Sequence, residues 1–335
     1  MTHTRTMVGD EARRRFQSAK TGRGPAEEGF EEGLKSPCDL NSLPLQHALS
    51  VDVEDWSNVV VFQQRGQFVP PTEAVVRNTE ILLELLLEHK AQATWFVLGE
   101  VAESFPYLIR RLAGADQELG VHGFHHEYVW SLSESAFRDS IRRAKNAVEQ
   151  AAGKPVLGHR APAFSITNQV PWAFDVLAEL GFHYDSSVFP AKTRRYGDNG
   201  ASLRPYQIQT HYGSLTEVPL SAVKLGPWRL PCCGGGYLRH FPLAYTRWAM
   251  RMLEREQRPA VVYLHPYELD LSFDRDYLIR QLGMEKLTEV WWRVRMQYRN
   301  RGKTVARLRH LLSKRRFEGI ARVFHLDEVR GCPYA

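Results

Sequence analysis

The sequence predicts an α/β fold in which parallel strands alternate with helices that pack outside them. Short apolar runs such as ALSVDV and AVVYL alternate with longer segments whose apolar residues recur at helical spacing. The chain has 335 residues, of which 43% are hydrophobic and 24% charged, so it has enough apolar material for a large buried core. Repeated strand–helix units imply a parallel sheet, either closed into a barrel or open and doubly wound.

The expected elements run from residue 45 to residue 270. Strands are expected at residues 48–53, 93–99, 118–123, 155–162, 182–189, 215–221 and 260–266. Helices are expected at residues 73–89, 103–113, 133–153, 169–181 and 243–257. Gly181 is expected to end the fourth of these helices.

The two ends of the chain differ from this central part. Residues 1–44 are rich in Arg, Glu, Gly, Ser and Pro, and we expect a disordered tail because such a segment buries too little apolar surface. Residues 271–335 place aromatics and Leu near helical spacing among many arginines, which predicts a basic helical extension packed on the barrel. A membrane surface or an anionic polymer is the alternative contact for its basic face.

Charge and cysteine content bound the functional class. A formal net charge of +6 is too small for a dedicated nucleic-acid binder. The four cysteines, Cys38, Cys232, Cys233 and Cys332, lack metal or redox spacing, which favours reduced thiols. The N-terminus has no apolar run after its basic residues, and the longest apolar runs are too short to span a bilayer. We therefore expect a cytoplasmic protein, with peripheral contact at the inner membrane through the basic C-terminal region as an alternative.

Ionisable side chains gather where the expected strands end, which is the edge where parallel-strand folds build active sites. Asp52, Glu54 and Asp55 close the first strand. Residues two apart in a strand point to the same side, so Asp52 and Glu54 can converge while Val53 packs away. One carboxylate could then bind a cation while the other serves as a general base. The alternative is a solvated acidic loop.

Two histidines follow the third expected strand. His122 and His126 are four residues apart, so in one helical turn or a tight loop both rings can face one metal ion, with His125 directed elsewhere. One carboxylate from residues 52–55 would complete two His and one acid with open positions. That is the ligand pattern of a catalytic Zn²⁺ or a similar ion.

Two further residues complete the candidate site. His265 ends the last expected strand before Pro266, where a metal hydrolase needs an acid for its leaving group. Arg160 could pair with Asp52 and keep that carboxylate ionised and aimed. The alternatives are a capped core histidine and a surface salt bridge.

Four of these motifs, SVDVED, HGFHH, RAP and LHP, stand in the order found in the NodB-type polysaccharide deacetylases, carbohydrate esterase family 4, which the chain resembles over roughly residues 46–270. The segments VDVEDW, HRAPAFSIT, YDSSVFP, GGGYLRHFP and YLHPYELD, with the basic C-terminal extension, resemble the exosortase-associated branch linked to bacterial exopolysaccharide production. The resemblance implies a distorted (β/α) barrel, one divalent metal ion, most simply Zn²⁺, and removal of acetyl groups from N-acetylated sugars.

The resemblance also implies a role for each residue. Asp52 matches the catalytic base, His122 and His126 the metal ligands, Arg160 the residue that orients the base, and His265 the general acid. The usual first motif has two adjacent aspartates, base then ligand, whereas Val53 follows Asp52 here. Branches with an acid-x-acid arrangement place the ligand two residues on, which matches Glu54. Asp55 is the alternate carboxylate.

Other residues are expected around the substrate. Trp56 and Tyr237 could stack on sugar rings, and Phe164 lies beside Ala163, where a backbone N–H could hold the oxyanion. Asp185 and Glu217 are candidates to orient His265 or the substrate, although a structural role is the simpler interpretation for each.

We therefore expect a hydrolase of linear amides that deacetylates a polysaccharide or its precursor. One alternative is a hydrolase of a small cyclic amide with the same fold. Another is a catalytically silent carbohydrate-binding module, which the presence of Asp52, Arg160 and His265 argues against.

Overall fold

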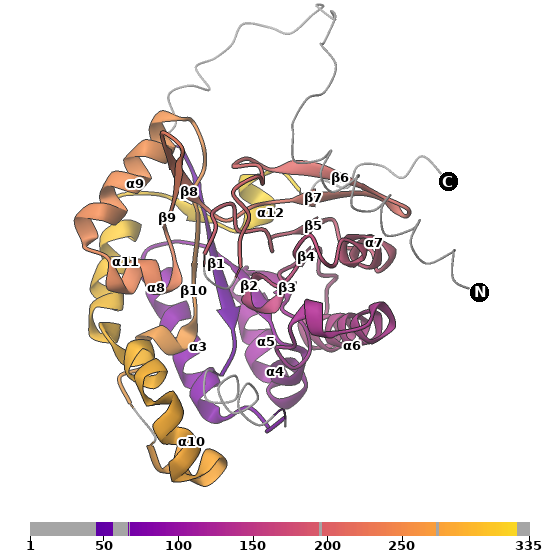
Figure 1. The fold of residues 1–335 in the computed structure, drawn as a ribbon, viewed down its shortest axis with the longest axis vertical. Helices are drawn as coiled ribbons and strands as arrows, with labels where there is room; N and C mark the ends of the chain where they lie inside the picture. Colours follow the sequence, from indigo (N-terminus) through magenta and orange to yellow (C-terminus); the bar gives the residue numbers. More distant parts are fainter. Residues whose placement is uncertain (1–44, 56–65, 67, 194–195, 273–274, 327–335) are drawn as a thin grey trace, which may run out of the picture.

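A mostly parallel β-sheet lies at the centre of the computed structural model, which describes residues 45–55, 66, 68–193, 196–272 and 275–326 (Figure 1). The strand order is β10-β1-β2-β3-β4-β5-β7-β6, and β11 pairs with β1. The strands of this sheet are β1 (His47–Val53), β2 (Thr94–Val97), β3 (Glu118–Val121), β4 (Gly158–His159), β5 (Tyr184–Asp185), β6 (Tyr206–Thr210), β7 (Gly213–Glu217), β10 (Val261–Leu264) and β11 (Phe317–Glu318). All its pairings are parallel except the β6–β7 hairpin.

The sheet curls into a barrel that is distorted between β7 and β10, where regular pairing stops. Two irregular segments, residues 218–221 and 232–234, bridge that gap with backbone hydrogen bonds in place of a full ladder. These bonds run from Leu220 N to Val188 O (3.0 Å), from Cys232 N to Ser221 O (3.3 Å) and from Tyr263 N to Cys233 O (3.2 Å). A separate hairpin, β8 (Ala222–Leu225) and β9 (Trp228–Pro231), lies between the two segments. The expected barrel of parallel strands is confirmed.

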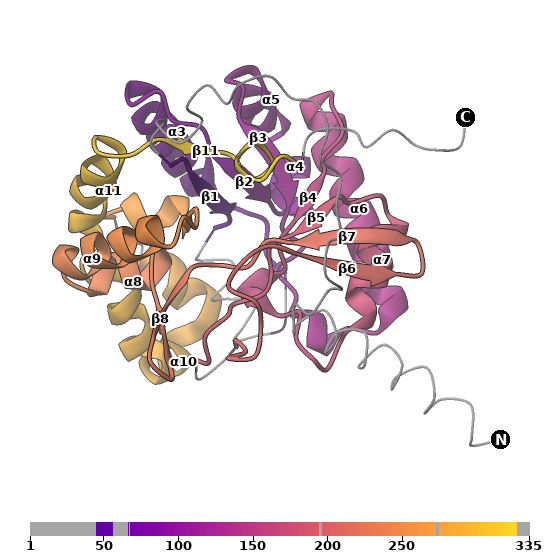
Figure 2. The same cartoon turned by 90° about the horizontal axis from the view of Figure 1, so that it is seen from above.

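Helices surround the strands (Figure 2). The first group is α3 (Glu73–Glu88), α4 (Gly99–Ser104), α5 (Pro106–Gly114), α6 (Glu134–Ala152) and α7 (Trp172–Glu179). In α6, the Ser133 side chain accepts a hydrogen bond from Ala136 N, and Gly153 ends the helix with a φ of 70°. The helix expected at 103–113 is instead divided, because Pro106 begins α5 where α4 has just ended.

The second group of helices follows the β6–β7 hairpin. It comprises α8 (Gly235–His240), α9 (Leu243–Arg255), α10 (Arg275–Tyr298), α11 (Thr304–Leu312) and α12 (Ile320–Val323). A break at Gly283, whose φ is 75°, divides α10 into two helical stretches. Among the described residues, no helix has the length and apolarity needed to cross a membrane.

Close packing of α8 depends on glycine. A Cβ on Gly234 would lie 2.3 Å from the ring of Tyr263, and one on Gly235 would lie 2.8 Å from it, so α8 can approach β10 only with glycine at both positions. The neighbouring Cys232 and Cys233 are buried free thiols.

The C-terminal segment returns to the end of the barrel where the strands begin. His47 of β1 pairs with Phe317 of β11, and the N–H of Ile320 donates to Thr94 Oγ1 at 2.7 Å. The N–H of Ala321 donates to Glu118 Oε2 at 2.9 Å. The extension is therefore helical as expected, but it also adds a strand to the sheet. The tail at 1–44 and the side chain of Trp56 lie outside the described residues.

Candidate metal centre and active site

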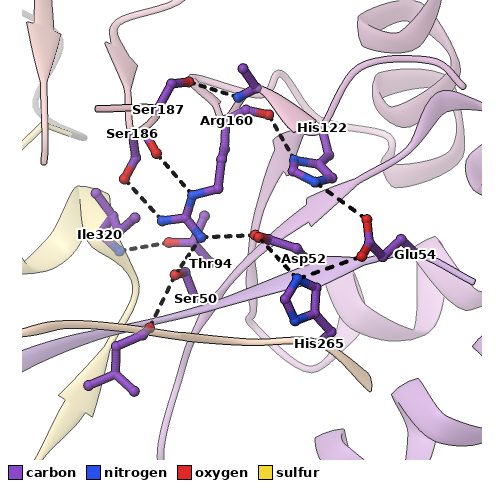
Figure 3. Close-up of polar contacts among 12 residues, drawn as sticks. Ser50, Asp52, Glu54, Thr94, His122, Arg160, Ser186, Ser187, His265 and Ile320 are labelled. Carbon is purple, nitrogen blue, oxygen red and sulfur yellow. Dashed lines mark hydrogen bonds and ion pairs between the residues drawn. The ribbon is translucent and has the colours of Figure 1, made fainter. Parts of the chain in front are cut away.

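The candidate residues meet at the carboxyl ends of the strands, as Figure 3 shows. Asp52 lies near the end of β1 and Glu54 directly after it, while His122 follows β3 and His265 follows β10. Arg160 follows β4. Because these strands are parallel neighbours in one barrel, their ends open onto the same space.

Glu54, His122 and His126 form a group that could hold a metal ion, each offering one ligand atom, all within 4.8 Å of one another. Glu54 Oε2 lies 2.8 Å from His126 Nε2 and 3.7 Å from His122 Nε2. The loop between the two histidines turns sharply, with φ of 81° at Gly123 and 60° at His126. This turn brings both rings to the same carboxylate.

Hydrogen bonding and burial prepare this group for a cation. His122 Nδ1 lies 2.8 Å from the carbonyl oxygen of Arg160, which can only accept, so Nδ1 carries the proton and Nε2 presents a lone pair. Burial lowers the pKa of His122 to about 4, which keeps the ring neutral as a ligand must be. Glu54 Oε2 is buried and, among the described residues, has no aligned hydrogen-bond donor. Two imidazoles and an under-satisfied buried carboxylate fit a divalent metal.

Glu54 is ionised in this environment. Burial opposes its ionisation, but the close contact of His126 and the neighbouring His265 and His122 rings outweigh burial and lower the Glu54 pKa to about 2. Asp55, the alternate carboxylate, has another task. Its Oδ2 accepts hydrogen bonds from the N–H of Thr72 at 2.8 Å and the Thr72 hydroxyl at 2.5 Å, at the start of α3. The geometry therefore favours Glu54 over Asp55 as the metal-facing acid.

Asp52 is held by a buried arginine. Arg160 is fully buried and donates from Nη1 to Asp52 Oδ1 at 2.9 Å and to Ser50 Oγ at 2.8 Å. Its other nitrogens donate to the carbonyl and hydroxyl oxygens of Ser186, both at 3.0 Å. The guanidinium is thus fixed on several sides, so it aims the Asp52 carboxylate. The other oxygen of Asp52, Oδ2, lies 3.8 Å from His265 Nε2.

His265 faces both acids with one nitrogen and a third acid with the other. Its Nε2 lies 3.6 Å from Glu54 Oε1, and its Nδ1 lies 2.7 Å from Glu268 Oε1. Burial disfavours the charged ring, but the hydrogen bond to Glu268 and the charges of Glu54, Glu268 and Asp52 outweigh burial and raise the His265 pKa to about 9. His265 is therefore placed and charged as a proton donor.

The structure places the expected substrate-binding residues in different surroundings. Phe164 lines an open cavity of about 760 Å³ together with Trp130 and Tyr196. Tyr237 is half-buried and stacks on Phe189, with ring centroids 6.1 Å apart. Phe164, with a φ of 53°, sits in a strained turn after Arg160. Trp56 lies outside the described residues.

Asp185 and Glu217 are buried acids that bond to residues other than His265. Asp185 Oδ1 is 2.7 Å from His159 Nδ1 and accepts from the Ser187 hydroxyl at 2.8 Å, whereas the only acid within hydrogen-bonding reach of His265 Nδ1 among the described residues is Glu268. Glu217 Oε1 accepts from Val188 N at 2.9 Å, and burial together with the Asp185 charge raises the Glu217 pKa. These bonds fit the structural role that was the simpler interpretation of both residues from the sequence.

Sequence reasoning missed Glu268. It lies three residues after His265 in the segment HPYE, so an i,i+3 acid–histidine pair was a signal available in the sequence. The expectation that His125 faces elsewhere fits the structure, because its Nδ1 lies 2.7 Å from Glu100 Oε2.

Comparison with known proteins adds two matches that together cover most of the chain. Residues 70–184 match the family described as polysaccharide deacetylase, and residues 186–325 match a domain of unknown function, DUF3473. The site draws on both regions, because His122, His126 and Arg160 lie in the first and His265 lies in the second.

Individual relatives share the first region. A peptidoglycan-N-acetylglucosamine deacetylase of Bacillus cereus is 32% identical over 96 residues, covering 28% of this chain and 35% of the relative. A peptidoglycan deacetylase of Helicobacter pylori is 28% identical over 126 residues, covering 36% of this chain and 42% of the relative. A chitooligosaccharide deacetylase of a Bradyrhizobium species is 28% identical over 100 residues, covering 30% and 43%. The chain thus spans less than half the length of these relatives.

A solved structure covers nearly the whole fold. A Mycobacterium smegmatis protein assigned to the polysaccharide deacetylases superposes with a TM-score of 0.56 and 21% sequence identity, covering 89% of this chain and 95% of that one. This likeness shows the fold, including the part of the chain that follows β5.

Proposed function

We propose that this chain, whose residues 70–184 match the polysaccharide deacetylase family, is a metal-dependent hydrolase that removes N-acetyl groups from a polysaccharide or its precursor. One observation carries the proposal. The group of Glu54, His122 and His126 lies within ion-pair distance of His265, which in turn faces Asp52. A base, an acid and a metal-binding group thus border one space.

Each side chain then has a task in amide hydrolysis. Asp52, aimed by Arg160, accepts the proton of the attacking water. His265 donates a proton from Nε2 to the departing amine, which an amide requires because an unprotonated amine is a poor leaving group. When bound by Glu54 and the two histidines, a divalent ion, most simply Zn²⁺, supplies a Lewis acid that polarises the carbonyl and favours ionisation of water.

A backbone N–H would help to hold the negative oxygen. The N–H of Phe164 already donates to the carbonyl of Ala161 at 3.1 Å, so we assign this role to the N–H of Ala163. Ala163 has a φ of 52°, a backbone conformation that costs about 1–3 kcal/mol and that functional sites often retain. One such donor typically lowers the activation free energy by about 3–4 kcal/mol.

The cavity beside Phe164 suits neighbouring sugar units of a polymer. Trp130 is 37% exposed and offers an aromatic face, while Asn168, Gln169 and Asn199 offer groups that can hydrogen-bond hydroxyls. A small cyclic amide would need no such space. Because several motifs resemble those of the exosortase-associated branch, we propose an exopolysaccharide or its precursor as the natural glycan.

Metal analysis combined with acetate release tests this function. We expect one divalent ion per purified chain and acetate release from N-acetylated chitooligosaccharides that a chelator abolishes and added Zn²⁺ restores. His126→Ala is the matched control and should lose both metal and activity. A metal-loaded chain that releases no acetate from chitooligosaccharides, peptidoglycan or N-acetylated exopolysaccharide would refute the deacetylase function, and ring opening of a cyclic amide would replace it.

A further inference from the structure

A second charged pair lies behind His265, on the side away from the acids of β1. Glu268, only 1% exposed, accepts two hydrogen bonds at Oε1: one from His265 N at 3.2 Å and one from the ring Nδ1 at 2.7 Å. Its other oxygen, Oε2, lies 2.7 Å from Arg239 Nε, a close ion pair outside hydrogen-bonding alignment. The three residues form a continuous chain from Arg239 through Glu268 to the His265 ring.

The burial of this pair has a physical requirement. A carboxylate removed from water is strongly destabilised unless a cation compensates it. Arg239, only 4% exposed, supplies that charge. The Arg239 charge, with the hydrogen bonds and charge of His265, keeps the Glu268 pKa below its usual value although burial acts the other way. Glu268 is therefore ionised and able only to accept, which keeps the His265 proton on Nδ1 and directs Nε2 toward the acids.

Arg239 is held by the part of the chain that matches the domain of unknown function. Its Nη2 donates to Gln297 Oε1 at 3.1 Å, and its Nη1 donates to the Gln297 carbonyl oxygen at the end of α10. Arg239 itself lies in α8, whose last carbonyl groups accept hydrogen bonds from Arg307 of α11. Helices α8, α10 and α11 thus fix the guanidinium against Glu268.

We propose that Glu268 and Arg239 are positioning residues for His265, and that the region matching the domain of unknown function thereby completes the active site. The inference rests on the proposed deacetylase function. In the step concerned, the proton on His265 Nε2 passes to the nitrogen of the leaving amine as its bond to the acyl carbon breaks. The proton on Nδ1 stays in the hydrogen bond to Glu268. Without that bond, the ring is free to rotate and to change tautomer.

The experiment compares two leaving groups. An N-acetyl amide needs a proton donor, whereas an aryl acetate ester releases a stable phenolate without one. We expect Glu268→Gln and Arg239→Met to lower kcat for acetate release from chitooligosaccharides by about 100-fold, the usual contribution of a general acid. The same variants should change kcat for an aryl acetate less than about threefold, because attack on the ester does not use His265. Metal content should equal that of the unaltered chain.

Two further variants separate positioning from general stability. Arg239→Lys keeps the positive charge and should recover part of the amide activity lost in Arg239→Met. Arg258→Met removes a buried arginine of the same region that pairs with Glu256 and donates to the Ala222 carbonyl oxygen, away from α8 and Glu268, and it should leave the ratio of amide to ester activity unchanged. If Arg239→Met does not fold, Glu268→Gln and Arg239→Lys still give the ratio.

The possible outcomes are distinct. An equal loss on both substrates, a loss of metal, or full amide activity in Glu268→Gln would overturn the positioning role. If the unaltered chain releases no acetate from any glycan, the proposed deacetylase function itself is refuted, and this result is obtained without the variants.

Discussion

His47, at the start of β1, should make the stability of this protein depend on pH. Its ring is buried, its Nδ1 accepts a hydrogen bond from Ala260 N at 3.0 Å, and its Nε2 lies 3.4 Å from Glu254 Oε1. Burial lowers the His47 pKa to about 4, aided by the charge of Arg315 and opposed by the charge and hydrogen bond of Glu254. The ring is therefore neutral in the folded protein at pH 5, whereas in the unfolded chain it is protonated.

The sign and size of the effect follow from that difference. The unfolded chain binds the extra proton between pH 6.5 and about 4, so stability is fully present above pH 6.5 and falls as the pH drops toward 4. At about 1.4 kcal/mol per pKa unit, the full contribution is roughly 3 kcal/mol. About 2 kcal/mol of it should be lost between pH 7 and pH 5.

Chemical denaturation of the unaltered protein and of His47→Asn at pH 7 and pH 5 measures this contribution. Asparagine keeps an oxygen to accept from Ala260 N but does not titrate. Other groups, including His122, also change protonation in this range, so the relevant quantity is the difference between the two proteins. We expect the unaltered protein to lose about 2 kcal/mol more than the variant between the two pH values. Equal losses would refute the assignment of a buried neutral ring.

Three substitutions test the site and its supporting structure. Asp52→Asn should lower the rate of deacetylation by about 10²–10⁴-fold with metal still bound, and retained turnover in acetate-release assays would remove Asp52 as the base. Elemental analysis should show that Glu54→Gln loses the metal and that Asp55→Ala keeps it. Asp55→Ala should also lower the free energy of unfolding by about 1–2 kcal/mol, because it removes the two hydrogen bonds from Thr72. The reverse pattern of metal loss would make Asp55 the ligand. Gly158→Ala places a Cβ 2.1 Å from the buried Tyr184 ring and should lower the free energy of unfolding by about 1–3 kcal/mol, so an unchanged denaturation midpoint would contradict this packing.

Elements whose side chains recur at a regular spacing along the sequence could be predicted without the structure. The alternation along β1 places Asp52 and Glu54 on one side, and the spacing of His122 and His126 brings both rings to Glu54. The parallel sheet follows from the repeated strand–helix units, since such units connect in few ways. Residues that are brought together by regular spacing within one segment can therefore be identified from the sequence alone.

The remaining features depend on contacts between distant segments. β11 has only two residues, too few to show a period, and its position is set by pairing with His47. Arg239 of α8 meets Glu268 only because α8 lies beside the short segment Pro266–Leu269 that follows β10, so no local pattern marks the pair. Asp55 and Glu54 are adjacent, and only the position of Thr72 at the start of α3 separates their roles.

The pairing of β1 with β10 and β11 has a consequence for how the chain folds. Strand β1 is made before its partners Val261–Leu264 and Phe317–Glu318, which follow more than 200 residues later, as the 212-residue separation of the Ser50–Val262 hydrogen bond illustrates. Until then one edge of β1, whose residues are all buried in the finished protein, has no partner strand from this sheet. Contacts of such long range slow folding and leave an edge open to wrong pairing. The strand that carries Asp52 is thus expected to gain its partners β10 and β11 only late in synthesis.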